Sequence, residues 1–152
     1  METLDLIWSF APEWKIRLLV LVVLANMFLA MRLYGVMSRV RYKAAKEGRV
    51  TVDTYKATQN EPEDVAVFSR AVANQFESPV LFYAIIGISL AIGVSSWITL
   101  ALSAAYVFLR WTHANEMIGE HVVLRRRKIF VRSVYVLMAL MAELAVSTLL
   151  KA

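Results

Sequence analysis

Apolar positions along this chain gather into long blocks separated by segments rich in charge. The most extreme block runs from residue 78 to residue 109 and contains no charged side chain. A helix needs roughly 20 apolar residues to cross a hydrocarbon core about 30 Å thick, so this block is too long for one perpendicular span. It contains the turn signal Gly93-Val-Ser-Ser96, followed by Trp97 as an interfacial anchor. The pattern therefore predicts two helices joined by a short turn.

The remaining blocks complete a set of four predicted membrane spans. Hydrophobic residues make up 59% of the 152-residue chain and its mean hydropathy is +0.57, which is far above the usual soluble composition. We expect an all-α integral membrane protein, a four-transmembrane-helix bundle that forms a single domain over residues 1–152. The spans cover about residues 16–37, 70–92, 97–117 and 129–150, with polar loops at about 38–64 and 118–128.

The distribution of lysine and arginine predicts how the bundle is oriented. The segment from Arg39 through Arg70 holds seven basic residues, and the segment from Arg110 through Arg132 holds six. The positive-inside rule makes both of these connections cytoplasmic and places both termini outside the membrane, N-out and C-out. The basic residues behind the net charge of +5 are concentrated beside the spans, so the orientation of the protein in the membrane explains them. We therefore expect no nucleic-acid partner.

Composition also narrows the chemistry. The chain has no cysteine, which excludes disulfides, thiolate metal sites and a cysteine nucleophile, and we expect no metal. The N-terminus carries acids where a secretory signal would carry lysine or arginine, so we expect nothing to be removed on maturation.

Polar side chains enter the predicted second span at regular spacing. In a continuous helix, offsets of four and three place Arg70, Asn74 and Glu77 on one stripe, with Glu77 about 10 Å deeper than Arg70. The third span brings Arg110 and His113 to a comparable depth. Ionisable groups within a membrane are costly unless they are paired or hydrated, so this convergence predicts a functional site.

Structural explanations of the same residues stay open. Asn74 would also serve to join helices, and Glu77 would also serve as an ion-pair partner of Arg70 or Arg110. Glu143 lies towards the outer leaflet, away from the cluster, and we interpret it as an acid of helix packing or of a subunit interface.

These residues resemble the MAPEG family, the membrane-associated proteins of eicosanoid and glutathione metabolism. The resemblance rests on four membrane helices, a basic first loop, the sequence RAVANQFE that opens the second helix as R-A-x-x-N-x-x-E, and Arg110-Trp-Thr-His113 in the third. It implies a homotrimer that holds glutathione near the cytoplasmic side and performs transferase, peroxidase or isomerase chemistry on a lipophilic small molecule. The motif looks most like that of the bacterial members, which implies a multi-pass protein of the inner cell membrane.

The resemblance also implies roles for individual residues. Family members position glutathione with the arginine, asparagine and glutamate that match Arg70, Asn74 and Glu77. Arg39 matches a contributing arginine just after the first span, and His113 matches a glutathione-contacting histidine. Arginine forks suit the carboxylates of glutathione, and a cation near its sulfur would stabilise the thiolate.

The position of the thiolate-stabilising arginine has two candidates. The arginine-serine pair of the family matches Arg132-Ser133, which implies that Ser133 is among the glutathione-binding residues, whereas ungapped spacing from His113 points to Arg126. The chain also carries Ala73 and Met117 where the prostaglandin-forming members have an arginine and a tyrosine that contact glutathione. The alternative to an enzyme is therefore a non-catalytic MAPEG-like lipid-binding protein or an accessory subunit of a larger membrane complex.

Overall fold

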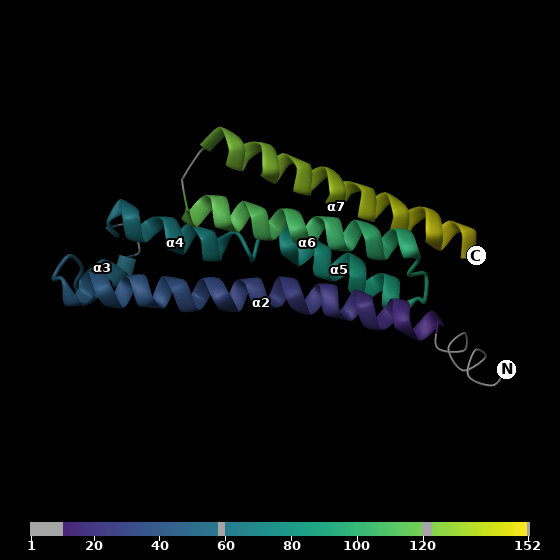
Figure 1. The fold of residues 1–152 in the computed structure, drawn as a ribbon, viewed down its shortest axis with the longest axis horizontal. Coiled ribbons are helices and arrows are strands. Elements are labelled where there is room, and N and C mark those ends of the chain that lie inside the picture. Colours follow the sequence, from purple (N-terminus) through teal and green to yellow (C-terminus); the bar gives the residue numbers. More distant parts are fainter. Residues whose placement is uncertain (1–10, 58–59, 120–122, 152) are drawn as a thin grey trace.

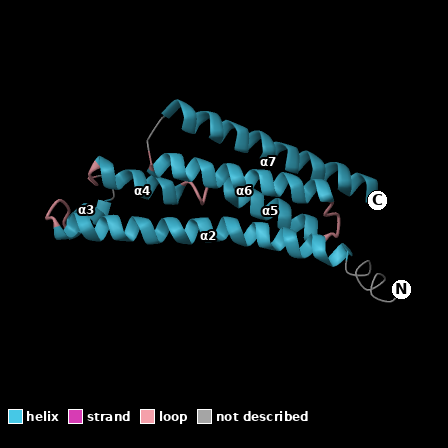
Figure 2. Ribbon diagram, viewed as in Figure 1, coloured by secondary structure: helices cyan, strands magenta, loops and turns pink. Residues whose placement is uncertain are grey.

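The computed structural model describes residues 11–57, 60–119 and 123–151, and this part of the chain consists of helices joined by short loops, without strands (Figure 2). The helices are α2 (Ala11–Lys46), α3 (Val52–Ala57), α4 (Glu63–Ala73), α5 (Ser78–Ala91), α6 (Trp97–Ile118) and α7 (Val123–Lys151). Helices α2, α6 and α7 form long rods, and α4 and α5 follow one another end to end (Figure 1). The start of α2 and the end of α7 lie at the same end of the bundle.

Three helical stretches in the described residues are long and apolar enough to cross a membrane, namely Glu13–Lys46, Glu63–Ala91 and Val123–Lys151. They correspond to the first, second and fourth predicted spans and indicate a multi-pass membrane protein. Helix α6 is not among them, because Arg110 and His113 lower the hydropathy of its second half. The count of four spans and the N-out, C-out orientation stay predictions.

Helix α6 nevertheless occupies the centre of the bundle, where it packs against α7, α2 and α4. Apolar side chains fill the space around it, and the rings of Phe82 and Tyr106 stack with their centroids 4.8 Å apart. The outer faces of α2 and α7 are apolar too, as Phe28 and Met138 illustrate with exposed fractions of 63% and 58%. Such faces need lipid or another subunit to cover them.

The second predicted span is interrupted, which corrects the expectation of one continuous stripe. Helix α4 ends at Ala73 and α5 begins at Ser78. Pro79, the second residue of α5, has no backbone N–H, and in a continuous helix its ring would clash with the carbonyl of Gln75. The chain therefore leaves the helix for four residues, so the calculated depth of Glu77 below Arg70 does not apply.

The predicted turn between the second and third spans is confirmed. Gly93 has a φ of +66°, a left-handed conformation that favours glycine, and α6 begins four residues later at Trp97. The side chain of Ser96 caps α6 by accepting a hydrogen bond of 3.0 Å from the backbone N–H of Thr99.

A polar network outside the predicted spans fixes the position of α4. Arg41 of α2 forms an ion pair of 2.7 Å with Glu61, and its guanidinium lies 4.9 Å from the centroid of the Tyr55 ring in α3. Ser69 donates a hydrogen bond of 2.6 Å to the second carboxylate oxygen of Glu61. These contacts join α2, α3 and α4 immediately before Arg70.

Glu143 joins α7 to the beginning of α6. Its Oε1 accepts hydrogen bonds from the hydroxyls of Ser96 at 2.6 Å, Thr99 at 2.9 Å and Ser147 at 3.1 Å. A carboxylate is favoured near a helix N-terminus, where unpaired N–H groups carry partial positive charge. The interpretation of Glu143 as a helix-packing acid agrees with this geometry.

We expect the Glu143→Ala variant to lower the free energy of unfolding by about 1–2 kcal/mol, because interhelical hydrogen bonds in membranes have contributions of this order. Glu143→Gln keeps a carbonyl acceptor for the hydroxyls and serves as the control, with a smaller loss. Titration with a denaturing detergent, followed by circular dichroism, measures both changes. Equal stability of the alanine variant and the unmodified protein would contradict this role.

Candidate functional site

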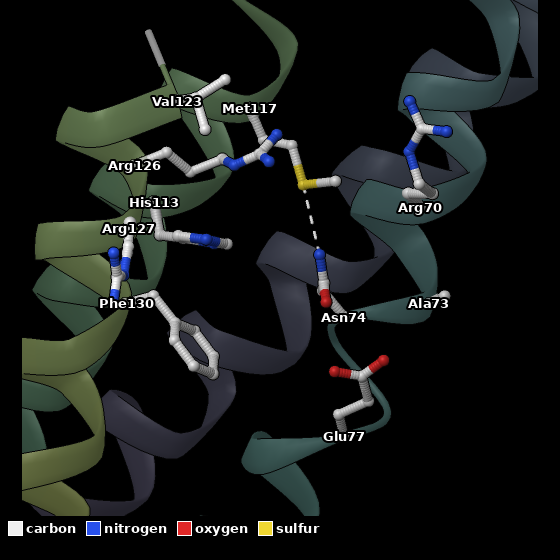
Figure 3. Close-up of a pocket in the computed structure, with 10 residues that line it drawn as sticks. All are labelled: Arg70, Ala73, Asn74, Glu77, His113, Met117, Val123, Arg126, Arg127 and Phe130. Atoms are coloured by element: carbon white, nitrogen blue, oxygen red, sulfur yellow. Dashed lines mark hydrogen bonds between the residues drawn. The ribbon is translucent and has the colours of Figure 1, made fainter. Parts of the chain in front are cut away.

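A cavity of about 530 Å³ opens at the end of the bundle that the charge pattern predicts to be cytoplasmic. It lies between the junction of α4 with α5 on one side and helices α6 and α7 on the other (Figure 3). Its walls combine charged, polar and apolar side chains: Arg70, Ala73, Asn74, Glu77, His113, Met117, Val123, Arg126, Arg127 and Phe130.

The first wall depends on the break in the second span. Asn74 caps the end of α4, and Glu77 occupies the position just before α5. In Figure 3 the Glu77 carboxylate points towards Asn74. The Asn74 amide Nδ2 lies 3.2 Å from the Met117 sulfur, a contact that crosses from α4 to α6.

The second wall is built from one face of α6 and the first turns of α7. His113 is 5% exposed, and its ring lies 5.7 Å from that of Phe130, centroid to centroid. Its Nδ1 is buried and has no hydrogen-bond partner among the described residues. The Arg126 guanidinium extends from α7 towards Met117 (Figure 3). The neighbouring Arg125 instead pairs with Glu116 at 3.1 Å.

The charges of the cavity are free to act on a ligand. In the described part of the chain, none of Arg70, Glu77 and Arg126 takes part in an ion pair. The pairing of Glu77 with Arg70 or Arg110, which the sequence left open, is therefore not formed within 4.0 Å. Three arginines and one carboxylate suit a ligand that carries several anionic groups and one cation.

Arg110 of α6 holds the junction of α4 with α5. The side chain is fully buried, and its Nη2 donates a hydrogen bond of 2.7 Å to the backbone carbonyl of Asn74. The carbonyls at the end of a helix have no intrahelical partner, and a cation is favoured beside them. Arg110 therefore acts as a positioning residue, because its contact fixes the backbone between Asn74 and Glu77.

The structure brings five of the predicted site residues together and separates three others. Arg70, Asn74, Glu77, His113 and Arg126 line one cavity.

The other three predicted residues point elsewhere. Arg39 is exposed, and its Nε donates to the carbonyl of Gly35 in its own helix. Arg132 lines a separate groove of about 330 Å³ on α7. Ser133 is fully buried and donates a hydrogen bond of 2.7 Å to the carbonyl of Phe130.

Sequence reasoning missed Phe130, Val123 and Arg127 as lining residues. Helical spacing was the available signal for all three: together with Arg126 they occupy positions i, i+3, i+4 and i+7 from Val123 and so share one face of α7. The approach of α7 to α6 decides that this face lines the cavity.

We expect the Arg110→Met variant to loosen the junction, because it removes the charged donor to the Asn74 carbonyl while keeping most of the side-chain volume. Hydrogen–deuterium exchange over residues 70–80 should accelerate by about tenfold or more. Arg17→Met is the matched control, since the ion pair of Arg17 with Glu13 is exposed on both sides and contributes little. The positioning role is wrong if both variants exchange at the rate of the unmodified protein.

Comparison with known proteins identifies the family. The model of the MAPEG family matches residues 18–146, a range that contains every lining residue of the cavity. No curated protein sequence and no solved structure gives a match. The match covers most of the chain and confirms the resemblance carried by R-A-x-x-N-x-x-E and Arg110-Trp-Thr-His113, so the protein belongs to the MAPEG family.

Proposed function

We propose that this protein binds glutathione in the cavity and activates its thiol as a thiolate towards a lipophilic electrophile or hydroperoxide. Membership of the MAPEG family supports, in general, a membrane function of glutathione-related transferase, peroxidase or related type. The proposal extends to a homotrimer in a bacterial inner membrane, with four spans and both termini outside.

The observation that carries the proposal is the charge set of the cavity, formed by Glu77 with Arg70, Arg126 and Arg127, none of which forms an ion pair within the described part of the chain. Glutathione has two carboxylates, one ammonium and a thiol. Arginine forks bind carboxylates in a bidentate manner, and Glu77 complements the ammonium. The cavity volume of about 530 Å³ falls in the range of roughly 300–1,000 Å³ that is typical of small-molecule sites.

The chemical step requires a thiolate. A free thiol has a pKa of about 8.5, and a neighbouring cation lowers that pKa and raises the nucleophilic fraction at neutral pH. We assign this role to Arg126 because it lines the same cavity as Glu77 and His113.

Arg132 is the second candidate for this role. It is exposed on α7, where the proposed homotrimer would bring it next to a neighbouring subunit. In the same assembly, Arg39 would assist in binding the anionic ligand and Ser133 would hold the first turns of α7 in place.

A second candidate function is a non-catalytic lipid-binding protein or accessory subunit. The observation that favours it is that two residues of the cavity wall, Ala73 and Met117, offer a ligand little hydrogen bonding. The Ala73 side chain has no hydrogen-bonding group, and the Met117 sulfur already contacts Asn74. Ligand binding and thiol ionisation separate the two functions.

Glutathione should bind the purified protein in detergent, and Glu77→Gln should weaken that binding by about 10- to 100-fold, because a charge-assisted hydrogen bond to the ammonium is lost. Isothermal titration calorimetry measures the affinity. The matched control is Glu63→Gln, which alters an exposed acid at the start of α4. Absence of binding at millimolar glutathione, with the assembly intact, would overturn the proposed function. A bundle destabilised by Glu77→Gln with or without thiol would favour the accessory-subunit function.

Arg126→Gln should raise the pKa of the bound thiol and lower the rate with an electrophile at neutral pH, whereas Arg132→Gln should change both much less. The ultraviolet absorbance of the thiolate, titrated against pH in the presence of each variant, reports the pKa directly. The two substitutions remove the same charge from one helix, so each serves as the control for the other. The reverse order of effects would transfer the role to Arg132.

A further inference from the structure

Another hollow lies in the apolar part of the bundle, between α2 and α5. It is a groove of about 290 Å³, and its walls are apolar except for one hydroxyl: Val20, Val23, Leu24, Met27, Tyr83, Ile86, Gly87 and Leu90. It shares no lining residue with the first cavity. Gly87 lies ten residues beyond Glu77, which corresponds to roughly 15 Å along the helix.

The hydroxyl is held in place by an amide buried in α2. Asn26 is 1% exposed, and its Nδ2 donates a hydrogen bond of 2.9 Å to the Tyr83 hydroxyl oxygen. The hydroxyl proton is then left to donate, and no described residue accepts it. The Asn26 Oδ1 is also buried without a partner among the described residues. A polar group left unsatisfied in hydrocarbon is costly, so the Tyr83 hydroxyl proton indicates a missing hydrogen-bond acceptor; the Asn26 Oδ1 is itself an acceptor and does not contribute to this argument.

Gly87 keeps the groove open. A Cβ added at this position would meet no atom within 4 Å, so no close approach of another segment requires a glycine. Glycine inside a helix costs about 1 kcal/mol relative to alanine. Gly87 therefore destabilises the helix, and the side chain that it lacks leaves empty volume beside Tyr83.

We propose that this groove binds a lipophilic carbonyl compound dissolved in the membrane. Its apolar body would lie against the aliphatic walls of α2 and α5, and its carbonyl oxygen would accept the hydrogen bond from Tyr83. A phospholipid acyl chain matches the groove less well, because its ester carbonyls lie at the interface and only methylene groups reach this depth. The site is additional to the proposed function, since its residues are not those of the glutathione cavity.

The test uses the full-length protein in proteoliposomes and an alkyl-substituted benzophenone, which is both a carbonyl compound and a photolabel. Mass spectrometry should locate the label in peptides that contain residues 20–27 or 83–90. Competition by 2-undecanone should be about fivefold stronger than competition by undecane, because only the ketone accepts the hydrogen bond. In Tyr83→Phe this difference should disappear while labelling itself persists.

Gly87→Leu should fill the groove and abolish labelling, whereas Gly87→Ala should retain most of it. Glutathione affinity and circular dichroism of both variants should be unchanged, which separates a failure of this site from a failure of the proposed function. Equal competition by ketone and alkane in the unmodified protein would overturn the proposal, as would labelling that persists in Gly87→Leu. A change in the mass of the assembly in Gly87→Leu would show that a neighbouring subunit occupies the groove, and would overturn it too.

Discussion

The cavity depends on the hydrogen bond from Arg110 to the backbone carbonyl of Asn74, because this bond stabilises the break in the second span between α4 and α5. Pro79 forces that break by removing a backbone donor. In a low-dielectric setting, the freed carbonyls at the end of α4 need a partner. A buried guanidinium supplies it, and the chain between Asn74 and Glu77 then keeps one course along the wall of the cavity.

Polar contacts at its start and in its second half fix helix α6 in the bundle, and apolar side chains pack the stretch between them. At the start, Glu143 of α7 accepts hydrogen bonds from Ser96 and Thr99. In the second half, Arg110 donates to the junction of α4 with α5. Apolar packing does little to fix rotation or register when lipid is as apolar as the neighbouring helix. Directional hydrogen bonds at these two places supply this specificity, so His113 and Met117 face the cavity.

Much of the fold followed from the periodicity and charge of the chain. The turn at Gly93 and the helical blocks on either side of it were predicted from uncharged length and a glycine signal. The interruption before Ser78 was missed, although Pro79 was visible, because offsets of four and three suggested an unbroken helix. The choice between Arg126 and Arg132 was undecidable from spacing, since each matched a different feature of the family pattern.

The sequence by itself determined that this protein is helical and that it belongs in a membrane. It also identified the polar residues whose position within a span is costly and therefore indicates a site. Those conclusions depend on the composition of single segments, which needs no knowledge of their neighbours. Only the tertiary structure decided that Glu77 forms no ion pair with another described residue, that Arg126 shares its cavity while Arg132 does not, and that Asn26 reaches Tyr83. Each of these features depends on how two helices that are distant in sequence approach and rotate against one another. Apolar periodicity leaves that rotation undetermined.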